Sequence, residues 1–292
     1  MHRTVRPRRS ALYLPASNAR ALEKARTLDV DVLLLDLEDA VAPSAKVEAR
    51  QQAVAALQAG GYGHRELVVR VNGAATPWGA EDLAALARAP VRPDAVLLPK
   101  VEAPAQLSAA AAALDAAGAP ADLPLWAMIE TPRGVLRAAE IAASPRLACL
   151  VAGTSDLAKD LGARVTAGRP ELVTALSLVV LAARAHDRAC LDGVHLDLDD
   201  EAGLEAACRQ GRDLGFDGKT PIHPKTIAAA NLAFGPGQAE LELARRFMVA
   251  HAEAETFGRG VVVVDGRLVE GLHVEAARRR LALAEAIAAR GR

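Results

Sequence analysis

Aromatic residues are scarce in this chain of 292 residues. They make up 3% of the sequence, although 51% of its residues are hydrophobic. The core must therefore be built from Ala, Leu and Val, a composition that suits helices packed closely on a Val- and Leu-rich sheet. Excess charge is lacking as well, because the formal net charge is -1. This balance indicates no nucleic-acid or anionic-membrane partner, so local charge must carry any anion binding.

Cysteine is also rare. Cys149, Cys190 and Cys208 are odd in number, have no CxxC spacing, and lie in apolar runs. We expect buried reduced thiols in place of a disulfide or a nucleophile. No apolar signal-peptide core follows the basic residues 1–9, and no apolar stretch reaches transmembrane length. The chain is therefore predicted to stay in the cytoplasm.

Short apolar runs alternate with Ala-rich amphipathic stretches from Ser10 onward, at intervals of roughly thirty residues, as βαβ units require. The predicted strands are Ala11–Pro15, Val32–Glu38, Glu66–Asn72, Ala95–Val101, Leu125–Glu130, Leu147–Gly153, Ala189–His195 and Gly218–His223. The predicted helices are Asn18–Leu28, Ser44–Ala59, Gly79–Arg88, Pro104–Ala117, Arg133–Ala143, Pro170–His186, Glu201–Leu214 and Pro224–Ala233. Eight such units favour a closed α/β barrel of the (β/α)8 TIM type over an open sheet.

A different pattern begins at the Gly-Pro-Gly sequence of residues 235–237, which predicts the end of the barrel. We therefore divide the chain into a barrel at 1–236 and an arm at 237–292. The arm is predicted to contain a helix, a hairpin around Asp265-Gly266, and a last helix, at Ala239–Glu255, Gly260–Val264, Leu268–Glu270 and Val274–Ala289. An isolated hairpin is only marginally stable, so the arm must rest on its own barrel mouth or on a neighbouring subunit. We interpret it as a lid and oligomerisation arm.

Two carboxylates, Glu130 and Asp156, follow successive predicted strands. Parallel strands end on a common side, so these acids can face one point in space. Carboxylate oxygens suit Mg²⁺ or Mn²⁺, whereas Zn²⁺ is disfavoured because no His/Cys cluster has ligand spacing. His195 and His223 are interpreted as structural groups. A lone acid at a strand end is more often a helix cap, but several polar strand ends together favour a metal site.

Arg70 ends the apolar run of residues 67–69. Burying a guanidinium is costly without an anionic partner, and its planar fork matches a carboxylate. Two interpretations satisfy this requirement: a clamp for a substrate carboxylate, or an ion pair with Glu38 or Asp39. We favour the clamp.

Seven motifs in this order resemble the citrate lyase β-subunit-like (CitE-like) branch of the HpcH/HpaI aldolase superfamily. They are residues 9–15, 36–41 with Pro43, Lys46 and Arg50, 70–72, 98–102, 129–131, 156–157 with 160–162, and 218–224. The resemblance implies a (β/α)8 barrel in a homotrimer or larger homo-oligomer. It also implies a Mg²⁺-dependent carbon–carbon lyase that converts a citryl-, malyl- or citramalyl-CoA type thioester to acetyl-CoA and a 2-oxo acid.

The resemblance also suggests roles for individual residues. Glu130 and Asp156 would be the metal ligands and Arg70 the clamp for the oxo-acid carboxylate. Water and the surroundings of the ion would be organised by Glu38 and Asp39. The candidate CoA contacts are Arg9, Asn18, Lys24 and Lys100. Glu270 stands where the family's lid carries an Asp that a neighbouring subunit brings to the active site.

Two other functions stay open at this point. An enolising barrel with a lid acid can direct water to the thioester, which would make the protein an acyl-CoA hydrolase of the malyl-CoA thioesterase kind. A catalytically idle subunit that binds an acyl carrier or a partner is the other alternative. The ligand pair and the clamp weaken this last alternative, because an idle subunit has no need to keep them.

Overall fold

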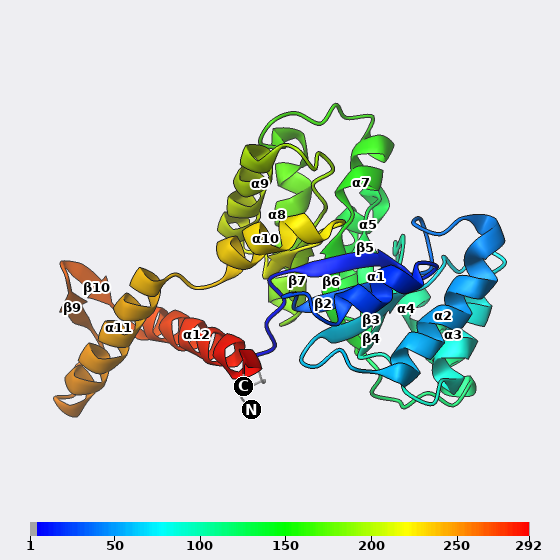
Figure 1. The fold of residues 1–292 in the computed structure, drawn as a ribbon. Helices are drawn as coiled ribbons and strands as arrows, with labels where there is room; N and C mark the ends of the chain where they lie inside the picture. The colour runs from blue at the N-terminus through cyan, green and yellow to red at the C-terminus, as the bar shows by residue number, and fades with distance from the viewer. Residues whose placement is uncertain (1–4, 292) are drawn as a thin grey trace. The chain divides into compact units, whose positions relative to one another are not determined.

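The computed structural model describes residues 5–291 and divides the chain into two compact units (Figure 1). One unit covers Arg8–Asn231, and the other contains the described residues before Arg8 together with the chain from Leu232 onward. The boundary predicted between a barrel at 1–236 and an arm at 237–292 lies a few residues after this one. Residues 1–4 and 292 lie outside the described part.

The first unit is built on eight parallel strands that follow one another in sequence order. They are β1 Ala11–Pro15, β2 Val32–Asp36, β3 Glu66–Arg70, β4 Ala95–Leu98, β5 Leu125–Ile129, β6 Leu147–Ala152, β7 Ala189–Asp192 and β8 Gly218–Lys219. A parallel bridge between Ser10 and Lys219 brings β8 beside β1. The backbone N–H of Tyr13 also donates to the carbonyl of Pro221 at 2.9 Å. The predicted (β/α)8 barrel is therefore confirmed as a nearly closed one.

Alternate side chains of these strands fill the barrel interior, as the two-residue period of a strand requires. Leu34, Leu97 and Met128 belong to this buried core. At the amino ends of the strands, Arg8 donates to both oxygens of Glu66 at 2.7 Å, and its guanidinium lies 4.9 Å from the centre of the Trp126 ring. This end of the barrel is thus filled, and a site must lie at the carboxyl ends.

Helices follow the strands around the barrel. They are α1 Ala19–Ala25, α2 Lys46–Ala59, α3 Gly79–Arg88, α4 Pro104–Ala116, α5 Pro132–Leu136, α6 Ala138–Ala142, α7 Thr154–Leu161, α8 Pro170–Ala185, α9 Glu201–Leu214 and α10 Ile227–Phe234. The helix predicted at Arg133–Ala143 is split, because Arg137 at φ -110° and ψ 12° leaves the α-helical region. Helix α7 was not predicted. It places Asp156 in a first helical turn and ends at Gly162 in the left-handed conformation.

Every predicted barrel strand except the first ends later than the strand in the structure. At two of these ends, a side chain binds the backbone that follows. After β2, the Asp36 carboxylate accepts the N–H groups of Glu38 at 2.9 Å and Ala40 at 3.0 Å. After β7, the Asp192 carboxylate accepts the N–H of Gly193 at 2.8 Å. Such local bonds turn the chain out of the sheet. Strand β8 is also shorter than predicted and ends at Lys219.

The second unit contains the predicted helix–hairpin–helix arm. It consists of α11 Gln238–Thr256, β9 Val262–Val264, β10 Arg267–Val269 and α12 Gly271–Ala288 (Figure 1). The two strands pair antiparallel, and both turn residues, Asp265 at φ 49° and Gly266 at φ 75°, are left-handed, as a two-residue hairpin requires. No helix among residues 5–291 has the length and apolar character needed to cross a membrane. All three cysteines are buried and free, as expected.

Candidate active site

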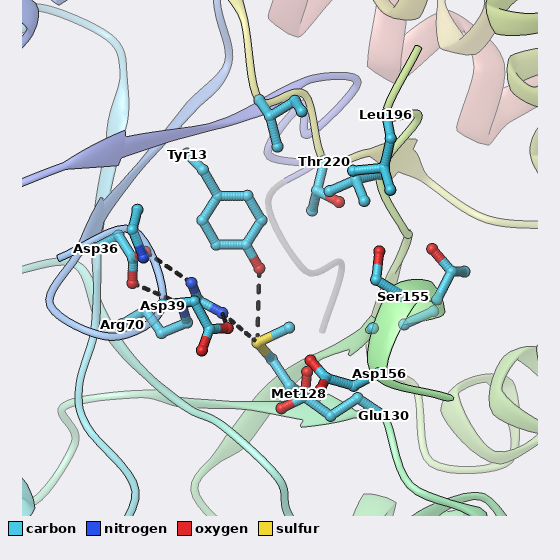
Figure 2. A pocket seen from close by; sticks show the side chains of 16 residues that line it. Tyr13, Asp36, Asp39, Arg70, Met128, Glu130, Ser155, Asp156, Leu196 and Thr220 are labelled. Atoms are coloured by element: carbon cyan, nitrogen blue, oxygen red, sulfur yellow. Dashed lines mark hydrogen bonds and ion pairs between the residues drawn. The ribbon is translucent and has the colours of Figure 1, made fainter. Parts of the chain in front are cut away.

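A pocket of about 320 Å³ opens at the carboxyl ends of the barrel strands (Figure 2). This volume is at the small end of the range for small-molecule sites, about 300–1,000 Å³. Figure 2 shows Asp36, Asp39 and Arg70 on one side and Leu196 and Thr220 across from them. The pocket therefore has a charged side and a side that is mainly apolar.

Glu130 follows β5 and lies at the pocket with 1% of its surface exposed. Its Oε1 accepts the backbone N–H of Lys100 at 2.7 Å. Lys100 has a φ of 49°, a left-handed conformation that is costly for a residue other than glycine. A Cβ on Gly153 would lie 2.3 Å from the Cβ of Glu130 and 2.5 Å from its Oε2. The N–H of Lys100 thus fixes the Glu130 carboxylate, and the absence of a side chain at Gly153 leaves the space that it occupies.

Glu130 and Asp156 both line the pocket, and both are labelled in Figure 2. The pKa of Glu130 is raised to about 7, chiefly by burial; the charges of Glu38 and Asp156 also raise it, whereas the Lys100 N–H and Arg70 lower it. A cation bound at this point would favour the ionised form of the Glu130 carboxyl group.

These two carboxylates fit Mg²⁺, which commonly takes one or two protein carboxylates and completes its octahedron with water and substrate oxygens. Within residues 5–291, no group of three or more His, Cys, Asp or Glu side chains is arranged to hold a metal ion. The donor set is therefore of the sparse magnesium kind and unlike a zinc site.

Arg70, at the end of β3, forms a buried ion pair. Its Nε and Nη2 donate to the two oxygens of Asp36 at 2.6 and 2.7 Å. Its Nη1 lies 3.0 Å from Glu38 and 3.2 Å from Asp39. The guanidinium also stacks on the Tyr13 ring at 4.8 Å. Asp36 thus takes one edge of the fork, and Glu38 and Asp39 pair with Nη1, so a pocket ligand would have to share or replace the Nη1 contacts.

Asp36 is the main partner of Arg70, and the sequence analysis considered only Glu38 and Asp39 for this pairing. The sequence contained this information, because Asp36 and Arg70 lie near the ends of neighbouring predicted strands. In the structure they lie opposite each other in the β2–β3 register. Asp36 also bonds the N–H groups of Glu38 and Ala40, so one buried carboxylate shapes both the clamp and the loop that carries Glu38 and Asp39.

Glu38 and Asp39 differ in exposure. The Glu38 side chain is 11% exposed, and burial raises its pKa. The Asp39 side chain is 56% exposed and lines the pocket. Lys46, which is buried, donates from Nζ to the carbonyls of residues 37 and 38 at 2.8 and 2.7 Å and thereby fixes this loop.

The four predicted CoA contacts lie in different surroundings. Lys100 adjoins the pocket, with its Nζ 3.4 Å from Glu38. Asn18 caps α1 by accepting the N–H of residue 21 at 3.1 Å, and Lys24 lies in the last turn of the same helix. Arg9 is buried at the amino end of β1, where it binds both oxygens of Asp31 at 2.9 and 2.8 Å. None of the four lines the pocket, but the backbone N–H of Lys100 binds Glu130, which does.

Glu270 belongs to the second unit, where it precedes α12. Its backbone N–H donates to Nδ1 of His273 at 3.1 Å, which caps the helix. In the first unit, Nδ1 of His223 accepts the N–H of Lys225 at 3.1 Å, in keeping with the structural role predicted for this histidine.

Comparison with known proteins assigns a family to this barrel. The family model described as HpcH/HpaI aldolase/citrate lyase matches residues 9–224. A (3S)-malyl-CoA thioesterase of Cereibacter sphaeroides is 53% identical over 97% of this chain and 96% of that protein. Citrate lyase subunit beta of Escherichia coli is 35% identical over 97% of this chain and 95% of that protein.

A solved structure agrees with these relatives. The protein CitE from Mycobacterium tuberculosis, in complex with magnesium, acetoacetate and coenzyme A, is 32% identical and aligns with a TM-score of 0.77 over 94% of this chain and 97% of that chain. Sequence motifs, barrel and comparisons lead to one assignment. The chain belongs to the HpcH/HpaI aldolase/citrate lyase family, in its citrate lyase β-subunit-like branch.

Proposed function

We propose that this protein is a Mg²⁺-dependent thioesterase that hydrolyses a malyl-CoA type thioester to malate and free CoA. The observation that carries this proposal is the 53% identity, along nearly the whole of both chains, to a protein named (3S)-malyl-CoA thioesterase. The carbon–carbon lyase favoured by the sequence analysis has weaker support, since the citrate lyase subunit is 35% identical. The alternative that we named there, hydrolysis, is thus the better one.

Arg70 would bind the free carboxylate of the malyl group. Asp36 engages Nε and Nη2 and fixes the plane of the guanidinium, so a substrate carboxylate would bind at Nη1, where it would compete with the contacts of Glu38 and Asp39. Stacking on Tyr13 at 4.8 Å restricts the plane further. Binding energy from the remote carboxylate is then used to orient the thioester.

Glu130 and Asp156 would hold Mg²⁺, or Mn²⁺, and the bound ion would supply Lewis-acid polarisation of substrate oxygens. Glu38 and Asp39, on the loop that Asp36 and Lys46 fix, would accept hydrogen bonds from water and orient it toward the thioester carbonyl. In the reaction the water oxygen bonds to the acyl carbon, the carbon–sulfur bond breaks, and a proton passes to sulfur.

We further propose that Lys100 contacts the CoA moiety, since it is the predicted CoA contact that adjoins the pocket. Glu270 remains our candidate for a lid acid. Assembly as a homotrimer, a cytoplasmic location, and contacts from Arg9, Asn18 and Lys24 to CoA remain predictions of the sequence.

A product assay tests the proposal. Purified protein is incubated with malyl-CoA and Mg²⁺, and free thiol and 2-oxo acid are detected in parallel. We expect thiol and malate without oxo acid, and little of either with the Asp156→Asn variant. Acetyl-CoA and oxo acid in equal amounts, without free thiol, would show a lyase instead.

A further inference from the structure

Three branched apolar residues line the pocket, Val194, Leu196 and Ile222, and we call them the apolar wall. Leu196 lies across the pocket from Arg70 in Figure 2. Leu196 is 66% exposed and Ile222 is 39% exposed, although both are large hydrophobic residues. Exposed apolar side chains at the mouth of a polar pocket indicate a surface that a ligand covers.

The segments on both sides of the apolar wall are anchored to the barrel. The carbonyl of Asp192 accepts both the N–H and the hydroxyl of Thr220 at 3.0 Å. The carboxylate of Asp192 is fully buried and accepts from Lys219 at 2.8 Å. The carbonyl of Pro221, next to Ile222, accepts the N–H of Tyr13. The residues that precede the apolar wall in each segment are therefore fixed to the barrel.

The charges of the pocket match one substrate carboxylate and no more. Among its lining residues in the described part of the chain, Arg70 is the single cation, against the acids Asp36, Asp39, Glu130 and Asp156. Lys100 adjoins the pocket, but its ammonium lies 3.4 Å from Glu38. A second free carboxylate would find acids and the apolar wall, with the hydroxyl groups of Thr154, Ser155 and Thr220 as neutral partners. It would lose its hydration without gaining a cationic partner.

We propose that Leu196 and Ile222 determine substrate specificity by admitting hydroxyacyl thioesters with one free carboxylate and rejecting those with two. A malyl group has one free carboxylate, and a citryl group has a second one on an additional carbon branch. The apolar wall would place an apolar surface against this charged branch. Such an unfavourable contact would reject the citryl group and thereby provide specificity. This inference rests on the proposed function, because it describes the acyl group of the same site.

The test compares malyl-CoA with citryl-CoA in wild type, Leu196→Lys and Ile222→Lys. Both positions are exposed enough to accept lysine without burying its charge. The control is Leu181→Lys on α8, because Leu181 is also a leucine with 66% exposure and does not line the pocket. Consumption of each acyl-CoA is followed by chromatography. This readout counts hydrolysis and carbon–carbon cleavage alike, so it tests specificity even if the reaction is not hydrolysis.

We expect wild type to prefer malyl-CoA by at least about 100-fold in kcat/KM, the scale of discrimination that a misfitting pocket contact provides. Lysine at position 196 or 222 should narrow this ratio by about tenfold or more, because an ammonium group can pair with the second carboxylate. The control variant should keep the wild-type ratio. Equal use of both substrates by wild type, or an unchanged ratio in both lysine variants, would overturn the proposal.

Discussion

Gly153 leaves the space in which the Glu130 carboxylate lies, so Gly153→Ala is a small change with a large expected effect on metal binding. The backbone is not the reason, because Gly153 has a φ of -97°, which alanine adopts freely. The reason is contact: the new Cβ would lie 2.3 Å from the Cβ and 2.5 Å from Oε2 of Glu130. Real carbon atoms do not approach so closely, so the Glu130 side chain must move.

The size of the effect of Gly153→Ala follows from the displacement of the Glu130 side chain. Forcing an extra methyl group into a packed site costs about 1–3 kcal/mol of folding free energy. Displacing Glu130 also breaks its hydrogen bond from the Lys100 N–H, which measures 2.7 Å. Misplacing a metal ligand through its supporting contacts lowers metal affinity by about 10–100-fold. We therefore expect a modest loss of thermal stability and a large loss of Mg²⁺ affinity.

Calorimetric titration with Mg²⁺ and a thermal melt of the metal-free protein measure the two effects separately. Gly79→Ala is the matched control, because a Cβ there would lie 2.6 Å from the carbonyl oxygen of Gly73, a comparable clash at the start of α3. It should lower the melting temperature to a similar degree and keep the wild-type Mg²⁺ affinity. Wild-type affinity in Gly153→Ala would refute the assignment of Glu130 as a ligand held in place by this glycine.

Three further predictions concern the clamp, a buried ion pair and the arm. Arg70→Lys should lose at least roughly tenfold in kcat/KM, about 1.4 kcal/mol, because lysine lacks the planar fork; wild-type kinetics would leave Arg70 a structural role alone. Asp192→Asn should destabilise the protein at pH 7 by about 3–5 kcal/mol, since it breaks a buried pair with Lys219. Although burial opposes ionisation, Lys219 and an arginine lower the Asp192 pKa below its ordinary 3.8, so this stabilisation is lost as the pH falls through that lower value. Urea unfolding should thus show a smaller difference from wild type at pH 3 than at pH 7. If the arm closes a neighbouring subunit, Asp156→Asn and Glu270→Gln proteins, dissociated and reassembled together, should regain part of the activity that each lacks; full activity of Glu270→Gln alone would dismiss the lid acid.

The barrel was predictable because alternation of apolar strands and amphipathic helices is a local property of the sequence. The strand starts agree with the structure, and errors concentrate at the strand ends. There, Asp36 and Asp192 bind the backbone with their side chains, and hydropathy carries no record of such bonds. Helix α7 escaped prediction because a single helix, Pro170–His186, was expected between the sixth and seventh strands, whereas the structure has two.

The residues of the pocket were predictable one by one, but the contacts between their side chains were not. Glu130, Asp156 and Arg70 stood out as polar residues after apolar runs, and all three line one pocket. The bidentate pair of Arg70 with Asp36 depends on strand register and side-chain direction, which only the folded barrel defines. Arg9 was chosen by resemblance, and its bond to Asp31 at the opposite end of the strand is likewise a tertiary contact.

Labelled water separates hydrolysis from carbon–carbon cleavage at the level of the atoms. Malyl-CoA is incubated with the protein and Mg²⁺ in ¹⁸O-labelled water, and the products are identified by mass spectrometry, with Asp156→Asn as the control for spontaneous hydrolysis. We predict malate that carries a single ¹⁸O atom in one carboxylate, together with free CoA, in amounts well above the control. Acetyl-CoA and a 2-oxo acid, with no more labelled malate than the control forms, would contradict the thioesterase function.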